Sequence, residues 1–592
     1  MTDPLREPGF LTAHQFRVVE AERNFFLVAC PGSGKTRAGA VRFARLTSDG
    51  ERVAATSYTN VGVEQIRAVV SRDLGIVVGA ESFVGTLHRM LLRFAFYPFG
   101  HIVMGCARRP RVVQEESAVW QDVVFGDNRI RASTARFSFR PDGDVRYRRS
   151  LPRGIGTRED AERLGGEQAI RLKARAAANG FASPDDAMYW SLCVLQEVPG
   201  VADAVASRFE ELQIDEAQDT SELQLACVRV LCDTGKLASL VLIGDLEQSI
   251  YSFQGASPTG CEELAAARAL KRIELSENHR SSQKICDIVV HFCTREAPDS
   301  AVGPSADCEW EPEVVLYPAG RVSEVLGWFE HRLQELGLEP ANAAVLGRAN
   351  DLVTEINGAS PVDVAPRLAA IGRAVAVVRL GGTLTRQGAE AVDRVVSTAS
   401  WDIDNLAGLD TVQRDLVREA SGKLIGRVPE LQGDLREWAR AVARALAETA
   451  GELVEAPARQ AGHLIRAEAR YAGVDASGGF PIVGGGLQAQ TVHDLKGESR
   501  DAVLVVAGRS AGGRHTPQGV LWSMPLTGEE IPDEDAEELR IAFVALTRAA
   551  RFCAVALPDD TGPGIVQAFL EHGFRRSAKE EAPLTHLEEG PR

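Results

Sequence analysis

The sequence predicts an α/β protein whose parallel sheets are flanked by helices. Short apolar runs rich in valine, isoleucine and alanine alternate with longer amphipathic stretches, as is typical of successive βα units. Each run ends beside a loop of polar residues or glycine, where α/β folds place their ligands. With 592 residues the chain is too long for a single core, so we expect two to four domains. The predicted strands cover residues 25–29, 52–56, 212–215, 240–244, 343–347 and 502–507.

Composition and charge exclude several classes of protein. The net charge of −16 argues against a protein that coats nucleic acid by bulk electrostatics. A groove lined locally with arginine is still compatible, because salt limits the reach of each charge to roughly 8–10 Å. The apolar stretches are strand-sized and no charged-then-apolar leader opens the chain, so we expect a cytoplasmic protein without a membrane span. The ten cysteines form no C-x-x-C pair, which favours reduced thiols.

The first predicted strand runs into a glycine-rich loop and then into a helix-forming stretch. Glycines in such a loop let backbone N–H groups face phosphates, while Lys35 reaches the β- and γ-phosphate oxygens and Thr36 ligates Mg²⁺. A chance glycine turn is the alternative, and the strand before and helix after the loop disfavour it. The expected nucleotide contacts are Ala29, Cys30, Pro31, Gly32, Ser33, Gly34, Lys35 and Thr36. Ala29 stands where the general pattern has its first glycine.

Two adjacent acids end the third predicted strand. Asp215 is expected to hold Mg²⁺ together with Thr36, and Glu216 to activate the attacking water. A solvated acidic turn is the alternative, but apolar Ile214 leads directly into the acids. The two features together predict an ATP-binding and ATP-hydrolysing site.

At Asp215-Glu-Ala-Gln-Asp219 the chain resembles the UvrD/Rep group of superfamily 1 helicases, and further blocks from Leu11 to Leu557 repeat the resemblance in order. The resemblance implies two RecA-like P-loop motor domains, each with an inserted, mainly helical subdomain. Leu11-Thr-Ala-His-Gln15 is similar to the block that reads adenine, which implies that Gln15 contacts the base and that Arg37 lies near it.

The resemblance also supplies the remaining catalytic residues. Gln248, in Gly244-Asp-Leu-Glu-Gln248, would sense the γ-phosphate. Arg280, in Asn278-His-Arg280, and Arg548, in Leu546-Thr-Arg548, would be the two arginine fingers that stabilise charge on that phosphate. For either arginine alone a surface salt bridge would be the simpler role.

Four blocks resemble the parts of the family's proteins that contact the DNA strand. Stacking on aromatic side chains is indifferent to base sequence, which suits a motor that steps along any strand. For the two aromatic residues of the coupling block, Tyr251 and Phe253, packing in the core is the alternative. The implied DNA contacts are Tyr58, Asn60, Thr86, His88, Tyr251, Phe253, His493 and Lys496.

The chain departs from the family pattern around the nucleotide. His279 stands where a tyrosine commonly stacks on adenine. After Lys496-Gly497 the family has Leu-Glu-aromatic, with the glutamate on the ribose, whereas this chain has Glu498-Ser-Arg500. We therefore expect Glu498 or Ser499 to take over the ribose contact, and nucleotide selectivity to be relaxed.

The domain organisation follows from the positions of the blocks. We expect the first motor domain at 1–94 and 186–280 with an insertion at 95–185, and the second at 281–378 and 485–557 with a reduced helical insertion at 379–484. Residues 558–592 are expected to form a polar C-terminal tail.

The predicted function is that of an ATP- and Mg²⁺-dependent DNA helicase or translocase acting on single-stranded DNA and on junctions of single- and double-stranded DNA. The resemblance implies 3′→5′ movement, in repair, recombination or defence. The main alternative is a helicase-like ATPase that senses nucleotides or DNA ends and regulates a partner OLD-type nuclease, as in the Gabija defence system. A metabolic P-loop kinase is a weaker alternative. We expect no fused nuclease, because the sequence has no Asp-x-Glu-x-Lys cluster outside the motor blocks.

Overall fold

The fold is taken from a computed structural model of the chain. The chain divides into two compact units, Met1–His279 and Arg280–Arg592. The structure describes residues 11–577 except 116, 118, 127–129, 149–150, 153, 251–257, 319–320, 358–363, 380–383, 385, 404–405, 407–408, 410, 455–463, 477–486, 509–515 and 533–534, and it does not describe the side chains of 387, 411 and 470.

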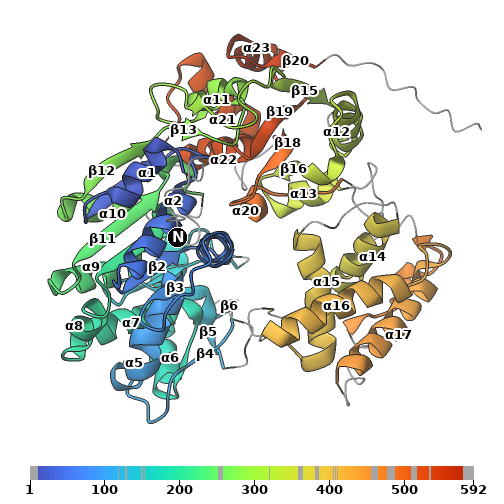
Figure 1. The fold of residues 1–592 in the computed structure, drawn as a ribbon. Helices are drawn as coiled ribbons and strands as arrows, with labels where there is room; N and C mark the ends of the chain where they lie inside the picture. Colours follow the sequence, from blue (N-terminus) through green and yellow to red (C-terminus); the bar gives the residue numbers. More distant parts are fainter. Residues whose placement is uncertain are drawn as a thin grey trace, which may run out of the picture. The chain divides into compact units, whose positions relative to one another are not determined.

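A six-stranded parallel sheet forms the centre of the first unit (Figure 1). Side chains alternate between its faces, so that Phe26 packs on one side while Phe25 and Leu27 pack on the other. Helices cover both faces, which is why the central strands are buried throughout. In spatial order the strands are β12 (Lys271–Leu275), β1 (Phe25–Ala29), β11 (Ser239–Gly244), β10 (Glu211–Asp215), β2 (Val53–Ser57) and β3 (Phe83–Thr86).

The helices of this unit divide between the two faces. The face of Phe25 and Leu27 is covered by α1 (Ala13–Glu20), α2 (Lys35–Ser48) and α3 (Asn60–Arg67). The opposite face is covered by α4 (Leu87–Leu91), α7 (Pro184–Glu197), α8 (Val201–Ala206), α9 (Glu222–Asp233) and α10 (Pro258–Ala267). The parallel strands and flanking helices confirm the predicted fold class.

A buried ion pair ties α2 to the middle of this sheet. The guanidinium of Arg42 donates from Nε and Nη2 to the two carboxylate oxygens of Glu211, each at 2.8 Å. Ser239 donates its hydroxyl to the same carboxylate at 2.9 Å, and Arg42 Nη1 reaches the carbonyl of Ala21 at 2.6 Å. The pair is therefore fully hydrogen-bonded, as buried charges require.

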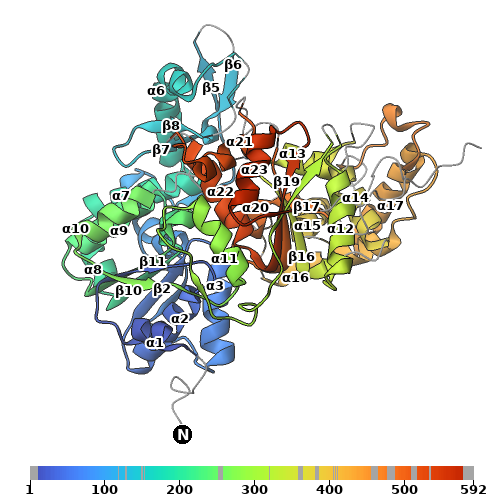
Figure 2. The same ribbon diagram turned by 90° about the horizontal axis from the view of Figure 1, so that it is seen from above.

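The inserted segment of the first unit combines helix and short strands. Figure 2 shows α6 (Arg158–Ala178) together with β5 (Asp122–Phe125) and β6 (Ile130–Ser133) beyond the end of the sheet. Two antiparallel pairs, β5 with β6 and β7 with β8, pack on α6. More residues are helical than extended, and the arginine-containing stretch of the insertion forms hairpins. The remaining elements are α5 (Tyr97–Val103), β4 (Arg111–Val112), β7 (Phe137–Phe139), β8 (Val145–Tyr147) and β9 (Phe181–Ala182).

The second unit is built on another six-stranded parallel sheet. One of its faces carries α12 (Glu324–Glu335) and α13 (Asn350–Ile356), whose apolar residues join the strands in one core. Further helices are α11 (Gln283–Val289), α20 (Val492–Leu495), α21 (Gln518–Ser523) and α22 (Ala536–Leu546). In spatial order the strands are β17 (Ala489–Thr491), β16 (Ala343–Gly347), β18 (Arg500–Val506), β19 (Ala549–Pro558), β15 (Glu313–Tyr317) and β20 (Arg575–Arg576).

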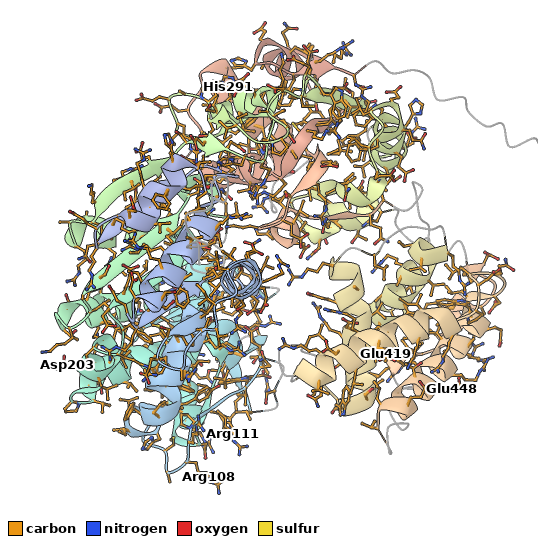
Figure 3. All side chains as sticks on the ribbon, in the orientation of Figure 1. Arg108, Arg111, Asp203, His291, Glu419 and Glu448 are labelled. Atoms are coloured by element: carbon orange, nitrogen blue, oxygen red, sulfur yellow. The ribbon has the colours of Figure 1, made fainter. Side chains whose placement is uncertain are left out.

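A helical cluster with its own core is inserted in the chain between β16 and β17, which are neighbours in the sheet. It begins at α14 (Pro366–Arg379), ahead of the boundary expected at 379, because Leu368 and Val375 pack into the same core. The other helices are α15 (Arg386–Trp401), α16 (Thr411–Arg427) and α17 (Leu435–Leu453). Exposed acids such as Glu419 and Glu448 lie on its outer surface (Figure 3).

The second unit continues past the end expected for it. The helix α23 (Pro563–Glu571) buries Val566, Ala568 and Phe569, and β20 pairs with β15 in the sheet. The expectation of a polar tail from residue 558 is therefore wrong up to residue 577, since an apolar helix face follows the last block. In the described part of the chain, no helix is both long and apolar enough to cross a membrane.

Candidate nucleotide-binding site

The glycine-rich loop lies at the carboxyl end of β1, in the middle of the first sheet. Gly32 and Gly34 adopt φ values of 73° and 74°, a left-handed conformation that glycine adopts without steric cost. The amide of Cys30 donates to the carbonyl of Leu275 at 2.8 Å, which anchors the loop to β12. The first helical turn of α2 follows at Lys35, so its amide groups face the loop, as a phosphate site requires.

The structure brings the lysine, the threonine and the two predicted acids together. Lys35 Nζ lies 3.2 Å from Glu216 Oε1, and Thr36 Oγ1 donates to Asp215 Oδ2 at 2.9 Å. Lys35 and Asp215 are buried, with 9% and 3% of their surface exposed. Glu216 adopts φ 53°, so the chain turns sharply at the end of β10 and directs both carboxylates toward the loop.

The surroundings of Asp215 fit a divalent cation. Its Oδ1 atom is buried and has no hydrogen-bond partner, which is costly for a carboxylate unless a ligand satisfies it. Burial and the neighbouring Glu216 raise the pKa of Asp215 to about 7, while Lys35 and the Thr36 hydroxyl oppose the shift. A bound cation would favour the ionised form, so Thr36 and Asp215 are the residues that would hold Mg²⁺.

Hydrogen bonds through Gln218, Asp245 and Gln248 connect Glu216, at the end of β10, to the loop that follows β11. Gln218 donates from Nε2 to Glu216 Oε2 at 2.5 Å and accepts from the amide of Asp245 at 3.1 Å. Gln248 in turn donates to Asp245 Oδ2 at 2.8 Å. The predicted γ-phosphate sensor is thus connected to the predicted base through two buried residues, Gln218 and Asp245.

A second polar group lies beside the loop where the base is expected. Gln15 donates from Nε2 to the carbonyl of Ser33 at 2.8 Å and forms a capping box with Thr12. Glu277 accepts from the Thr12 hydroxyl at 3.0 Å and lies 3.3 Å from His14 Nδ1. The backbone amide of His279 donates to the carbonyl of Gly32 at 3.0 Å.

The two blocks of the first unit that were predicted to contact DNA line one pocket at the carboxyl ends of β2 and β3. It encloses about 280 Å³, and Tyr58, Thr86 and His88 line it together with Arg148 and Asp185, which form an ion pair. Burial raises the pKa of Tyr58, with Asp219 adding to the shift, and burial lowers the pKa of His88. Both rings are therefore uncharged near neutral pH.

Some predicted contacts lie apart from this pocket or outside the described residues. Asn60 is exposed at the first position of α3 and does not line the pocket. Arg37 is partly buried in the first turn of α2. Tyr251 and Phe253 fall in the undescribed stretch 251–257, so their roles stay predictions.

The predicted arginines of the second unit gather around one threonine. Arg280 Nη1 donates to the carbonyl of Thr547 at 2.9 Å, and Arg548 Nη2 donates to the Thr547 hydroxyl at 3.4 Å. Arg548 also reaches the carbonyl of Glu498 at 3.5 Å. The Glu498 side chain accepts from Arg500 Nη2 at 2.8 Å, while Ser499 is exposed.

The last predicted contacts lie on α20, directly after β17. His493 is partly buried, and Lys496 follows the last residue of α20 with 7% of its surface exposed. Thr491 and Asp494 fix the start of this short helix through a capping box. The helix therefore holds both side chains near the carboxyl edge of the second sheet.

Sequence reasoning did not single out four polar residues of these sites. Gln218 belongs to the quoted Asp-Glu-Ala-Gln-Asp block, so a closer reading of that block would have found it. Glu277 belongs to the helicase block Leu275-Ser-Glu-Asn-His-Arg-Ser-Ser282 that also holds Arg280, but no role was predicted for it. Arg148 and Asp185 come from segments without a motif, and only the fold brings them to the pocket.

Comparison with known proteins agrees with this arrangement. Residues 149–267 match the UvrD/REP helicase N-terminal domain. The ATP-dependent DNA helicase PcrA of Staphylococcus epidermidis is 25% identical over 285 residues, covering 45% of this chain and 37% of that protein. The ATP-dependent DNA helicase UvrD1 of Mycobacterium leprae is 26% identical over 304 residues, with the same two coverages. The chain thus spans 37% of the length of these relatives.

Proposed function

Because the chain is a UvrD/Rep-like protein of helicase superfamily 1, we propose that it is an ATP-driven motor that moves on single-stranded DNA. The observation that carries the proposal is the placement of two sites on one sheet edge. Lys35, Thr36, Asp215 and Glu216 meet at the carboxyl ends of β1 and β10. The pocket of Tyr58 and His88 lies at the ends of β2 and β3, beside them.

Each residue of the nucleotide site has a chemical role in this proposal. Backbone amides of the loop and Lys35 bind the phosphates, and Glu216 orients and deprotonates the attacking water. Mg²⁺ held by Thr36 and Asp215 would neutralise charge on the β- and γ-phosphate oxygens. The 3.2 Å contact between Lys35 and Glu216 implies that Lys35 exchanges this carboxylate for phosphate when ATP binds.

Coupling to DNA is proposed to run through the buried amides. Gln248, Asp245 and Gln218 connect the γ-phosphate position to Glu216, so a change in the nucleotide alters the hydrogen bonds of β10 and β11. Of these two strands, β10 is adjacent to β2, whose end carries Tyr58. Arg280 and Arg548 are proposed as the arginine fingers, and 3′→5′ movement is proposed from the family resemblance.

Hydrolysis of ATP by the purified chain, with and without single-stranded DNA, tests the proposal. We expect strong stimulation by DNA, and a loss of turnover of about 10²-fold or more in Lys35→Ala and in Glu216→Gln. Glu216→Gln should still bind ATP, because it removes the base and keeps the loop. Turnover that ignores DNA, or survives in Lys35→Ala, would refute the motor. Duplexes with a 3′ or a 5′ tail then measure direction.

A further inference from the structure

A wide groove runs along the open edge of the first sheet. β3 pairs with β2 on one side only, because it is the last strand of the sheet. Beyond it, α3 and the π-helical segment Ala68–Asp73 form one wall, and α4 with the π-helical segment Leu92–Phe96 forms the other. The groove encloses about 1080 Å³, and none of the nucleotide-site residues lines it.

The groove concentrates positive charge in a chain whose net charge is −16. Glu64 is the one carboxylate in the lining. Arg72 is paired with Asp73 at 3.3 Å, but the other four arginines have no carboxylate partner among the described residues. The lining arginines are Arg67, Arg72, Arg89, Arg93 and Arg109. Exposed guanidinium groups left without counter-charges favour an anionic ligand.

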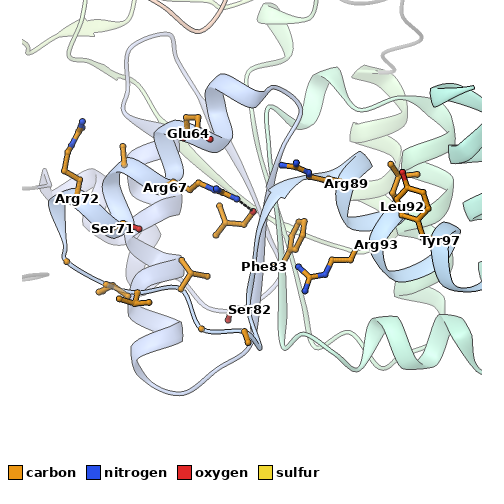
Figure 4. Close-up of a pocket in the computed structure, with 18 of the residues that line it drawn as sticks. Glu64, Arg67, Ser71, Arg72, Ser82, Phe83, Arg89, Leu92, Arg93 and Tyr97 are labelled. Atoms are coloured by element: carbon orange, nitrogen blue, oxygen red, sulfur yellow. Dashed lines mark hydrogen bonds between the residues drawn. The ribbon is translucent and has the colours of Figure 1, made fainter. Parts of the chain in front are cut away.

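Neighbouring groups hold several of these guanidinium groups in place. Arg67 donates from Nη2 to the carbonyl of Val84 at 3.1 Å, and Arg93 lies 5.2 Å from the centre of the Phe94 ring. Arg109 lies 5.1 Å from the centre of the Tyr97 ring. Figure 4 shows Arg67 on one wall and Arg89 and Arg93 on the other, converging on the edge strand at Phe83. The groove is therefore a preorganised row of cations.

The chemistry of the groove distinguishes between two kinds of occupant. An added β-strand would need the free carbonyl groups of β3, but Arg67 already occupies that of Val84. A phosphodiester backbone needs a row of arginines and no backbone partners. Arg89 comes directly after His88, which lines the proposed DNA pocket, so α4 contributes residues to both the groove and that pocket.

We propose that this groove binds the phosphate backbone of the same DNA strand after it passes the pocket of Tyr58 and His88. The inference rests on the proposed function, since it extends the path of the strand. The groove would add contacts that are independent of base sequence. Only a DNA strand that extends past the pocket of Tyr58 and His88 would reach them.

The test compares strands of about 12 and about 40 nucleotides, which differ in whether they extend past a binding footprint. Fluorescence anisotropy measures their affinity for the full chain and for Arg89→Ser/Arg93→Ser. We expect the variant to lose about tenfold in affinity for the long strand, and its log–log salt slope to fall by about 1.4, or about 0.7 per phosphate contact. Affinity for the short strand should change little.

The control is Lys271→Ser/Arg272→Ser, which removes two exposed cations from β12 at the opposite edge of the same sheet. It should leave both affinities unchanged. A long-strand affinity that is equal in wild type and Arg89→Ser/Arg93→Ser would overturn the inference. If, in that case, Arg89→Ser/Arg93→Ser binds a polyglutamate peptide more weakly than wild type does, the groove would be assigned to an acidic protein partner. Stimulation of ATP turnover by the short strand tests the proposed function separately. If the short strand does not stimulate turnover of the wild-type protein, the proposed motor function is refuted.

Discussion

Gly34 shows how one position of the phosphate loop combines two constraints. Its φ of 74° is strained for any residue with a side chain, and a Cβ there would lie 2.5 Å from Gln15 Nε2. The first constraint follows from the loop motif. The second depends on α1, whose Gln15 reaches the carbonyl of Ser33.

Gly34→Ala is expected to weaken ATP binding about tenfold or more, because the left-handed conformation costs roughly 1–2 kcal/mol and Gln15 must also move. Titration with a fluorescent ATP analogue measures the effect. Gly50→Ala is the matched control, since Gly50 also has a positive φ of 87° but no atom lies within 4 Å of its added Cβ. Equal affinities in wild type and Gly34→Ala would contradict the assigned loop geometry.

Asp215 and Glu277 mark the limit of reasoning from single residues. Asp215 was predicted because an acid at a strand end, beside a glutamate, fits ATP hydrolysis, and the structure adds its unsatisfied Oδ1. Glu277 lies in the same block as Arg280, but the block predicts no role for it, and its contacts with Thr12 and His14 join segments more than 260 residues apart.

The helices of the second unit's cluster depend on a cap that no motif predicted. Asp434 precedes α17 and accepts hydrogen bonds from the amides of Arg436, Glu437 and Gly473 at 3.0, 3.2 and 2.6 Å. The carboxylate therefore joins the start of α17 to the loop before β17. These bonds lower the pKa of Asp434, the one from Gly473 most strongly.

A folded-state pKa below the ordinary value of 3.8 gives the sign of the pH dependence. The contribution of Asp434 to stability is complete above that value and is lost as the pH falls through the lowered pKa. We expect Asp434→Ala, which removes the accepting oxygens, to reduce hydrogen-exchange protection of α17 at neutral pH and to remove this acid-dependent step. Asp415→Ala, at an exposed acid on α16, is the control. Protection of α17 that is identical in the Asp434 variant and wild type would rule out the cap.

Elements with strong periodicity or a motif were predictable, and marginal ones were not. The strands before the phosphate loop and before the acids were expected, because buried parallel strands appear as continuous apolar runs. The hairpins around α6 were not expected, since their short strands are rich in arginine and become buried only by packing on that helix. The end helix α23 was missed because its apolar residues follow a Pro- and Gly-rich turn.

The two units contribute different parts of the proposed cycle. The first carries Lys35, Asp215 and Glu216, and the second carries Arg280 and Arg548 around Thr547. Motors of this kind convert phosphate chemistry into motion when arginines from a second domain sense the γ-phosphate.

Arg280→Lys is expected to lower DNA-stimulated ATP turnover by about 10³-fold while ATP affinity changes little, because the guanidinium would act on charge that develops during hydrolysis. Steady-state turnover and equilibrium ATP binding measure the two effects. Arg551→Lys is the control, since that side chain stacks on Trp310 within the second unit. Normal turnover in Arg280→Lys would exclude it as an arginine finger.

The sequence by itself determined the α/β class, the phosphate loop, the acid pair and the order of the helicase blocks, because these depend on local patterns of residue type and spacing. Their assigned roles stay predictions until the variants are measured. Only the tertiary structure decided that Glu277 contacts Thr12 and His14 and that Arg148 and Asp185 complete the pocket of Tyr58. It also decided that five arginines line the edge of β3, four of them without a carboxylate partner in the described part of the chain. Such groups come from distant segments, and burial and charge pairing are properties of the packed chain that no local pattern specifies.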